Sequence, residues 1–229
     1  MSVELRKQIV DLSKKAAFQA NRHGLEDLRA QVVLVLDISQ SMNRLYRDGT
    51  VQKAIERILA LALTFDDDGA VDLFLFGTRA YQLPPITLDG IAGYVERVIL
   101  ADYKIVEATR YAPPLRLIHE KYRKPQADPV FVIFITDGGN ADRRETTEVV
   151  RAMSGEPVFI QFVGIGAEKF PFLQRLDDLT GRVVDNAGFM QVNDIALLKD
   201  SELFDRLLNE FPQWLPAARA AGILGDPSR

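Results

Sequence analysis

The sequence lacks cysteine altogether and contains only two histidines and one tryptophan among 229 residues. The absence of cysteine excludes disulfide bonds, thiolate zinc sites and cysteine nucleophiles, and it fits a reducing cytosol. A serine hydrolase would need a histidine base, but His23 follows the first predicted helix and His119 falls inside another. The composition therefore gives no support to these two kinds of nucleophilic enzyme.

Long apolar runs and an excess of positive charge are also missing. No window approaches 18 uninterrupted apolar residues, and residues 1–24 alternate charges with apolar residues instead of forming a signal peptide. The net charge is −4 and the isoelectric point is about 5.3. We therefore expect a cytoplasmic protein with no membrane insertion and no nucleic-acid partner.

Apolar segments of two kinds alternate along the chain. Short β-branched or aromatic runs predict strands, and stripes at spacings of three and four residues predict helices. The predicted strands are 31–37, 70–77, 80–85, 129–139, 157–166 and 181–186, and the predicted helices include 50–65, 113–124, 142–153, 170–179, 201–211 and 212–222. This alternation predicts a three-layer, doubly wound α/β fold with a mostly parallel sheet, helices on both faces, one short antiparallel edge strand and extra helices at both termini.

The first predicted strand ends in three side chains that carry oxygen. Asp37 follows the apolar run directly, and Ser39 and Ser41 come at alternate positions, so that both hydroxyls point the same way from an extended segment. Hard oxygen donors of this kind suit Mg²⁺, Mn²⁺ or Ca²⁺. Helix capping and turn hydrogen bonds are the alternative roles for these side chains.

A second aspartate, Asp137, ends the strand at 129–139 and is followed by two glycines. In open α/β sheets, ligands bind beyond the carboxyl ends of the strands, where both aspartates are expected. Two carboxylates at such an edge repel one another unless a cation or a shared proton lies between them. This pairing favours a metal site over simple capping.

The segments "VLVLDISQSM" and "VIFITDGG" together resemble the metal-ion-dependent adhesion site of von Willebrand factor type A (vWA) domains. The resemblance implies that Asp37, Ser39, Ser41, Thr109 and Asp137 surround one divalent cation, with Mg²⁺ preferred and Mn²⁺ or Ca²⁺ as alternatives. It also implies that a protein partner supplies a carboxylate to an open metal position. Because the sequence contains no complete catalytic constellation, we do not expect an enzyme.

The sequence departs from that family just before Thr109. Relatives usually carry a glycine at the position before this threonine, whereas Glu107 and Ala108 precede it here. Glu107 could either add a ligand to the metal or face the solvent. Thr109 is accordingly the member of the site whose placement depends most on the loop.

The resemblance extends to the bacterial vWA proteins of tellurium-resistance and general stress-response systems, and it covers nearly the whole chain. It implies a single vWA-like domain over residues 1–229, with an N-terminal helical extension at 1–29, an α/β core at 30–199 and C-terminal helices at 200–229. Near the C-terminus, Trp214, Phe211 and Leu215 are expected to pack onto the domain, and the alternative is a docking patch for a partner.

One enzymatic alternative is a metal-dependent phosphohydrolase that uses Asp37 as its nucleophile. That chemistry needs a second aspartate two residues later to act as acid and base, and Ser39 occupies this position. Nucleotide-binding glycine motifs do not follow the first strand either. A metal-dependent interaction module is therefore the favoured interpretation.

Overall fold

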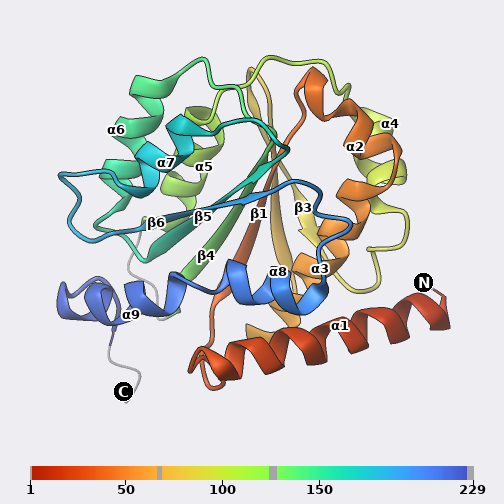
Figure 1. Ribbon diagram of the computed structural model, residues 1–229, viewed down its shortest axis with the longest axis horizontal. Coiled ribbons are helices and arrows are strands. Elements are labelled where there is room, and N and C mark those ends of the chain that lie inside the picture. Colours follow the sequence, from red (N-terminus) through yellow and green to blue (C-terminus); the bar gives the residue numbers. More distant parts are fainter. Residues whose placement is uncertain (1, 66–68, 124–127, 226–229) are drawn as a thin grey trace.

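The computed structural model describes residues 2–65, 69–123 and 128–225, which contain one six-stranded sheet in the order β3-β2-β1-β4-β5-β6 (Figure 1). The strands are β1 Gln31–Asp37, β2 Val71–Phe76, β3 Ala80–Ile86, β4 Val130–Thr136, β5 Val158–Ile165 and β6 Ala187–Val192. Neighbouring strands pair in parallel, except that β3 pairs antiparallel with β2 at one edge. The predicted doubly wound fold with an antiparallel edge strand is confirmed.

Strand β1 lies in the middle of the sheet because its apolar run can be buried on both faces. Val32, Leu34 and Leu36 belong to one hydrophobic cluster, and Val33 and Val35 belong to the other. Each of these five side chains is at most 2% exposed. The strand thus fixes the position of the polar residues that follow it.

Helices cover both faces of the sheet (Figure 1). One face packs against α3 Thr50–Phe65, α8 Asp200–Leu207 and α9 Phe211–Ala220, and the other against α5 Ala112–Tyr122, α6 Arg143–Met153 and α7 Pro171–Asp177. Trp214 is 2% exposed, and its ring centroid lies 5.8 Å from that of Phe159 on β5. The expected packing of the last helix onto the domain is confirmed.

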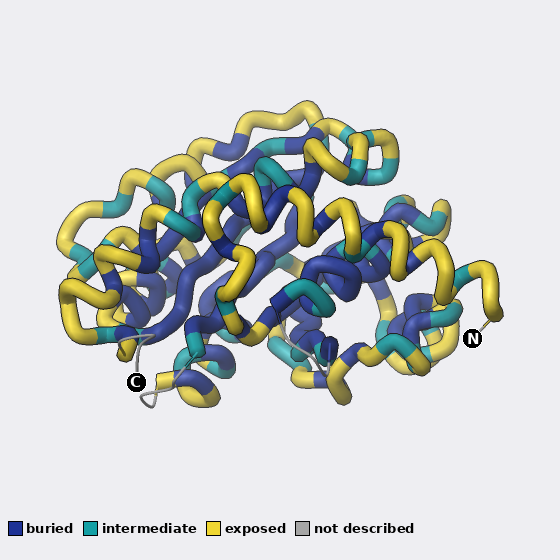
Figure 2. The backbone as a smooth tube through the Cα atoms, turned by 90° about the horizontal axis from the view of Figure 1, so that it is seen from below, coloured by how far each residue is buried: buried dark blue, intermediate teal, exposed yellow. Residues whose placement is uncertain are grey.

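The N-terminal helix α1 (Val3–Arg22) lies across α3 and α8 and ends before Gly24. Ile9, Leu12 and Ala60 of α3 form a small cluster between the helices. In Figure 2 the buried residues of α1 interrupt a mostly exposed outer surface. Helix α1 is therefore amphipathic, and its buried side packs chiefly on α3 and α8.

The connections near the carboxyl ends of the strands contain short helices. The segment after Ser39 forms η1 Gln40–Met42 and α2 Asn43–Arg47. At the start of α3, the Thr50 backbone N–H donates to the Asp48 side chain at 3.0 Å. Residues 90–100 begin with turns before η2 Val95–Ile99, which α4 Leu100–Asp102 follows.

The last strand was predicted at 181–186, but β6 begins only at Ala187. The Arg182 side chain turns inward and donates to the carbonyls of Leu176 and Asp177, while Val183 is 67% exposed. Side-chain hydrogen bonds therefore hold 181–186 as a loop. The alternating burial that suits an edge strand begins at Ala187.

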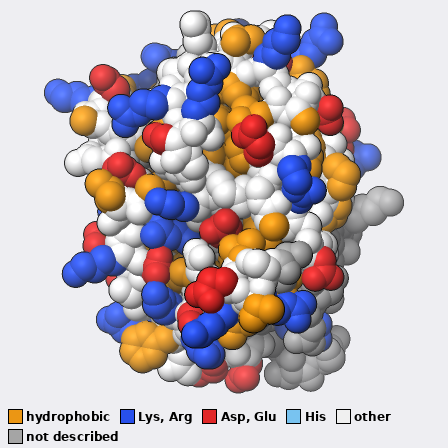
Figure 3. All heavy atoms as spheres, turned by 90° about the vertical axis from the view of Figure 1, so that its right-hand side faces the viewer, with side chains coloured by type: hydrophobic (Ala, Val, Ile, Leu, Met, Phe, Trp, Pro, Cys, Tyr) orange, Lys and Arg blue, Asp and Glu red, His pale blue; other side chains and the backbone are white. Residues whose placement is uncertain are grey.

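Among the described residues, no helix is both long enough and apolar enough to span a membrane. The face shown in Figure 3 carries lysine and arginine side chains interspersed with aspartate and glutamate, and hydrophobic atoms between them. This mixture agrees with the scattered charges of the sequence, since neither sign forms a continuous stripe across that face.

Candidate metal centre

The candidate metal centre lies at the carboxyl ends of β1 and β4, toward the top of Figure 1. These strands are parallel neighbours in which Leu36 is paired with Ile135. The residues that follow each strand, beginning with Asp37 and Asp137, therefore leave the sheet at the same edge. The structure thus brings together two segments that are far apart in the sequence.

Asp37 forms the buried floor of the site and has no exposed surface. Its Oδ1 accepts a hydrogen bond from the Ser39 N–H at 2.7 Å, and its Oδ2 accepts one from the Thr136 hydroxyl at 2.6 Å. Burial raises the pKa of this carboxyl group to about 6, although the hydrogen bonds from Thr136 and Ser39 lower it. The negative charge of Asp137 raises it further.

A chain of hydrogen bonds connects the serines to the second aspartate. The Ser39 and Ser41 hydroxyl oxygens are 3.2 Å apart, and the Ser41 hydroxyl donates to Asp137 Oδ1 at 2.9 Å. Ser39 is buried, whereas Ser41 is exposed. The Asp137 pKa is raised, chiefly by burial. The cluster of oxygen atoms is thus buried at Asp37 and exposed to solvent at Ser41.

Thr109 lies on the loop that precedes α5, between the segments of Asp37 and Asp137 in the sequence. It is connected to the second of these segments by its backbone. Its carbonyl accepts from the Ala141 N–H at 3.0 Å, just beyond the glycines that follow Asp137. Two residues earlier, Glu107 forms a parallel bridge with Ser39. Hydrogen bonds that use side-chain oxygens join four of the five predicted residues, whereas Thr109 is connected through its carbonyl to Ala141, four residues after Asp137.

Glu107 neither joins the other predicted ligands nor points freely into solvent. Its Oε2 accepts from the Thr78 N–H at 2.7 Å, and its Oε1 accepts from the Tyr81 hydroxyl at 2.9 Å. A Cβ at Gly77 would lie 2.3 Å from the Glu107 Cβ, so this glycine leaves the room for the contact. The carboxylate thus binds the turn between β2 and β3.

Several supporting residues were missed by the sequence analysis. Thr136 holds Asp37, the Tyr46 hydroxyl donates to the Asp37 carbonyl at 2.9 Å, and the Asp142 carboxylate accepts the N–H groups of Tyr111 and Ala112 at 2.9 and 3.1 Å. A hydroxyl at the end of the otherwise apolar β4 was the one signal in the sequence that could have identified Thr136. The other contacts depend on how distant loops meet.

The two histidines contact other parts of the molecule. His23 Nε2 lies 3.1 Å from Asp205 Oδ1, and His119 Nδ1 lies 3.0 Å from Glu156 Oε2. Both rings are thus paired with carboxylates of other helices or turns. This arrangement agrees with a structural role for each ring.

The donor set fits a hard cation. The described residues contain no group of three or more His, Cys, Asp or Glu side chains that could hold a metal, so a metal here would need the hydroxyl ligands as well as the two carboxylates. Both carboxyl groups have raised pKa values because they are buried. A bound cation would remove the repulsion between them, which is the chemistry expected of a Mg²⁺, Mn²⁺ or Ca²⁺ site.

Two relatives place the chain among known sequences. It is 40% identical over 222 residues to the uncharacterized protein YcbR of Bacillus subtilis (strain 168), covering 95% of this chain and 90% of that protein. It is 26% identical over 162 residues to Copine-E of Dictyostelium discoideum, covering 62% of this chain but only 27% of the copine.

Solved structures share the fold at low sequence identity. The SpRpn10 VWA domain matches with a TM-score of 0.57 at 14% identity, covering 80% of this chain and 95% of that one. Proximal thread matrix protein 1 from the mussel byssus, described with a zinc-occupied MIDAS motif, matches with a TM-score of 0.56 at 18% identity, covering 81% of this chain and 46% of that one. MIDAS denotes the metal-ion-dependent adhesion site.

The family model vWA-TerF-like, described as the vWA domain found in the TerF C terminus, matches residues 29–224. This match confirms the vWA resemblance, and its name agrees with the resemblance to tellurium-resistance proteins. The chain belongs to the vWA-TerF-like family.

Proposed function

We propose that this chain is a protein-interaction module whose binding depends on one divalent cation in a metal-ion-dependent adhesion site. The observation that carries the proposal is the hydrogen bond from Ser41 to Asp137, which joins the D-x-S-x-S segment to the T-D-G segment. Mg²⁺ is the cation that we favour, and Mn²⁺ and Ca²⁺ suit the same oxygen donors.

Each predicted ligand has a distinct part in this proposal. The hydroxyls of Ser39, Ser41 and Thr109 would bind the cation directly, while Asp37 and Asp137 would act directly or through water. The cation supplies a positive charge that attracts a carboxylate. The protein contributes a buried carboxylate at the floor and an exposed hydroxyl at the rim, so the ion would be held at the surface where a partner can reach it.

The proposed partner is a protein that presents an aspartate or glutamate to the open metal position. The net charge of −4 gives no general attraction for such a group, so the cation would provide it locally. The acidic composition also disfavours a nucleic-acid partner. Membership of a TerF-like family supports a place in a bacterial tellurium-resistance or general stress-response system, with the protein in the cytoplasm and not inserted in a membrane.

The test compares Ser41→Ala with Ser13→Ala, which makes the same chemical change in α1, where the Ser13 hydroxyl bonds only its own helix at the Val10 carbonyl. Mg²⁺ should raise the melting temperature of the wild type and of Ser13→Ala. In Ser41→Ala the rise in melting temperature should require at least tenfold more Mg²⁺, since a direct ligand is lost. Pull-down from native cells with Mg²⁺ should recover a partner with the first two proteins and lose it with Ser41→Ala or with EDTA.

Two results would contradict the proposal. Equal responses of the three proteins to Mg²⁺ would place the cation elsewhere. A partner that is retained equally by Ser41→Ala and in EDTA would show that the interaction does not use the metal.

The phosphohydrolase alternative has less support from the structure. Each Asp37 carboxylate oxygen already accepts a hydrogen bond, from Ser39 or Thr136, and the side chain is fully buried. A nucleophile needs one oxygen directed at the substrate. Phosphatase activity that is abolished by Asp37→Asn would reverse this preference.

A further inference from the structure

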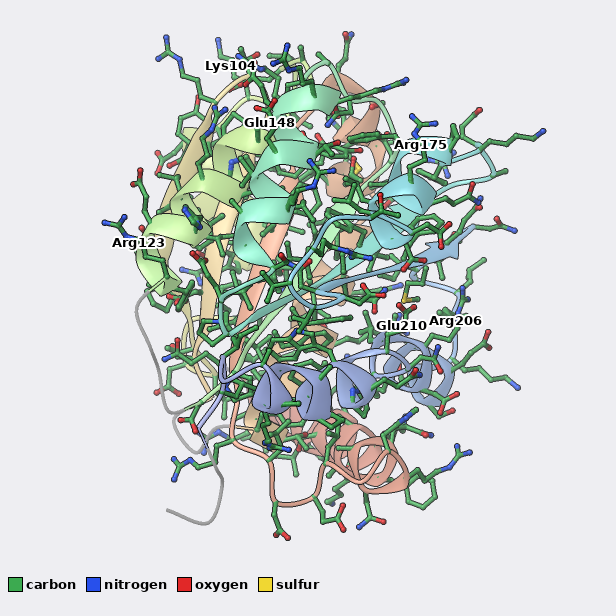
Figure 4. The ribbon with its side chains drawn as sticks, turned by 90° about the vertical axis from the view of Figure 1, so that its left-hand side faces the viewer. Lys104, Arg123, Glu148, Arg175, Arg206 and Glu210 are labelled. Carbon is green, nitrogen blue, oxygen red and sulfur yellow. The ribbon has the colours of Figure 1, made fainter. Side chains whose placement is uncertain are left out.

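A second group of oxygen atoms lies far along the chain from the adhesion-type site, where α7, β5, β6 and the α8–α9 turn meet. It consists of Gln161 on β5, Asp177 at the end of α7, and Glu210 between α8 and α9. Figure 4 shows Glu210 next to Arg206 beneath β6, and Arg206 donates to the Gln191 carbonyl of that strand at 2.6 Å. The proposed adhesion function uses none of these side chains.

Gln161 has an oxygen atom without a partner in a buried position. The residue is 1% exposed, and its Nε2 donates weakly to the Phe162 carbonyl at 3.4 Å. Its Oε1 has no hydrogen-bond partner. A buried polar atom left in this state costs about 1–3 kcal/mol, so such an atom usually indicates a missing ligand or water.

Gly188 shows where this oxygen is directed. Gln161 and Gly188 are paired on neighbouring strands, and a Cβ at Gly188 would lie 3.0 Å from Gln161 Oε1 and 2.7 Å from Glu210 Oε2. The two oxygens therefore approach the same point above the glycine. Any larger residue would fill this space, so the glycine keeps the two acceptors facing a common volume.

The charges around this volume are not balanced. The carboxyl groups of Asp177 and Glu210 are in hydrogen-bond contact, and burial raises the pKa of Glu210 to about 7 and that of Asp177 to about 6. Arg182 lowers the pKa of both carboxyl groups, but it also pairs with Asp185 at 2.7 Å and donates to the carbonyls of Leu176 and Asp177. Its single positive charge is therefore divided among three acidic side chains.

With the amide oriented as in the structure, a proton shared by Asp177 and Glu210 leaves the Gln161 oxygen without a partner. A cation can contact several acceptors together. We propose that Asp177, Glu210 and the amide oxygen of Gln161 form a second site for a hard divalent cation, and that Ca²⁺ suits this irregular donor set best.

The single tryptophan of the chain provides a local signal for this site. The backbone N–H of Trp214 donates to the Glu210 carbonyl at 3.2 Å, and the indole ring packs on Phe159. Binding at Glu210 should therefore change the tryptophan fluorescence. Binding at Ser41 and Asp137, which lie at another edge of the sheet, should leave it unchanged.

The experiment uses four proteins that have been treated with EDTA: wild type, Ser41→Ala, Glu210→Gln and the control Glu202→Gln on α8. Ca²⁺ is titrated into each, and binding is measured by tryptophan fluorescence and by calorimetry. We expect the fluorescence change in wild type, Ser41→Ala and Glu202→Gln. In Glu210→Gln its midpoint should move to at least tenfold higher Ca²⁺, while calorimetric binding at the other site persists. Gln161→Leu should also weaken the fluorescence response.

A fluorescence response that is unchanged in Glu210→Gln, or absent from Ser41→Ala, would overturn the second site. The second site would also be overturned if the wild type showed no response to Ca²⁺ and Glu210→Gln were more stable than the wild type near neutral pH. That result would identify the pair as carboxyl groups sharing a proton. Fluorescence reports on the second site alone, whereas calorimetry also detects binding at the adhesion-type site. The experiment therefore distinguishes failure of the second site from failure of the adhesion-type site.

Discussion

At the scale of single residues, Asp37 is the most strongly constrained group of the candidate metal centre. It is fully buried, it faces a second carboxylate, and its two oxygens are held by Ser39 and Thr136. Without a cation, ionisation of this side chain opposes folding because a buried charge is poorly solvated. The metal-free protein should therefore depend on pH in a way that the metal-bound protein does not.

We predict that the metal-free protein loses stability as the pH rises from about 4 to about 6. The pKa of Asp37 is raised from 3.8 to about 6 in the folded state, so folding is favoured by protonation and is penalised once the carboxyl group ionises. The loss should reach roughly 3 kcal/mol at most. Urea unfolding in EDTA across this range measures it.

Asp37→Asn is the control for this pH dependence, since the amide does not ionise. The variant should show a smaller loss between the two pH values, and without metal it should be at least as stable as the wild type near neutral pH. An identical pH profile in both proteins would assign the dependence to other groups.

The sequence was sufficient to find Asp37, Ser39, Ser41 and Asp137, because each follows an apolar strand at a short, readable spacing. It was not sufficient for the groups that hold them. Tyr46 and Asp142 act on backbone atoms of other segments, and such contacts leave no spacing pattern in the sequence. The role of Glu107 could not be found for the same reason, since its partners lie on a different turn.

At the scale of elements, the loop that carries Thr109 is fastened on both sides. Glu107 ties it to the turn between β2 and β3, and the Arg110 N–H donates to the Gly77 carbonyl at 3.0 Å. On the other side, Asp142 accepts the first N–H groups of the segment that leads into α5. The loop therefore takes its shape from hydrogen bonds that do not require a metal.

Glu107→Ala should weaken Mg²⁺ binding about tenfold although Glu107 is not a ligand, because groups that position ligands affect metal affinity on this scale. We expect a loss of stability of about 1–2 kcal/mol as well, from the lost hydrogen bonds. Calorimetric titration with Mg²⁺ measures the affinity, and Glu96→Ala at an exposed position of η2 is the control. Unchanged affinity in Glu107→Ala would show that the loop needs no such fastening.

Most elements could be predicted from the sequence because their apolar patterns are long and regular, as in β1 and β4. The position of β6 could not. Residues 181–186 contain two adjacent valines that suggest a strand, but the buried contacts of Arg182 hold this stretch as a loop. Local β propensity was outweighed there by hydrogen bonds to carbonyl groups at the end of α7.

At the scale of the whole molecule, α1 is joined to the fold chiefly through α3 and α8. The interpretation of the chain as one domain with helical extensions stays a prediction, and the stability of α1 tests it. Ile9→Ala should cost about 2–4 kcal/mol, because Ile9 is fully buried against Leu12 and Ala60. Val10→Ala, at a neighbouring residue that is 41% exposed, is the control.

Thermal unfolding monitored by circular dichroism distinguishes the two possibilities. A single transition that moves to lower temperature in Ile9→Ala, and stays in place in Val10→Ala, would support one cooperative unit. A separate early transition for α1 would instead make the helix an independent extension of the core.

The fastening of the Thr109 loop has a consequence for how the proposed site would respond to its cation. The loop and both aspartate segments are held in the fold by hydrogen bonds that do not need a metal, so binding should order little additional chain. Such preorganisation keeps the entropic cost of binding low. The cation would then change the charge at this edge of the sheet much more than its shape, and a partner would distinguish the loaded from the empty protein chiefly by electrostatic attraction.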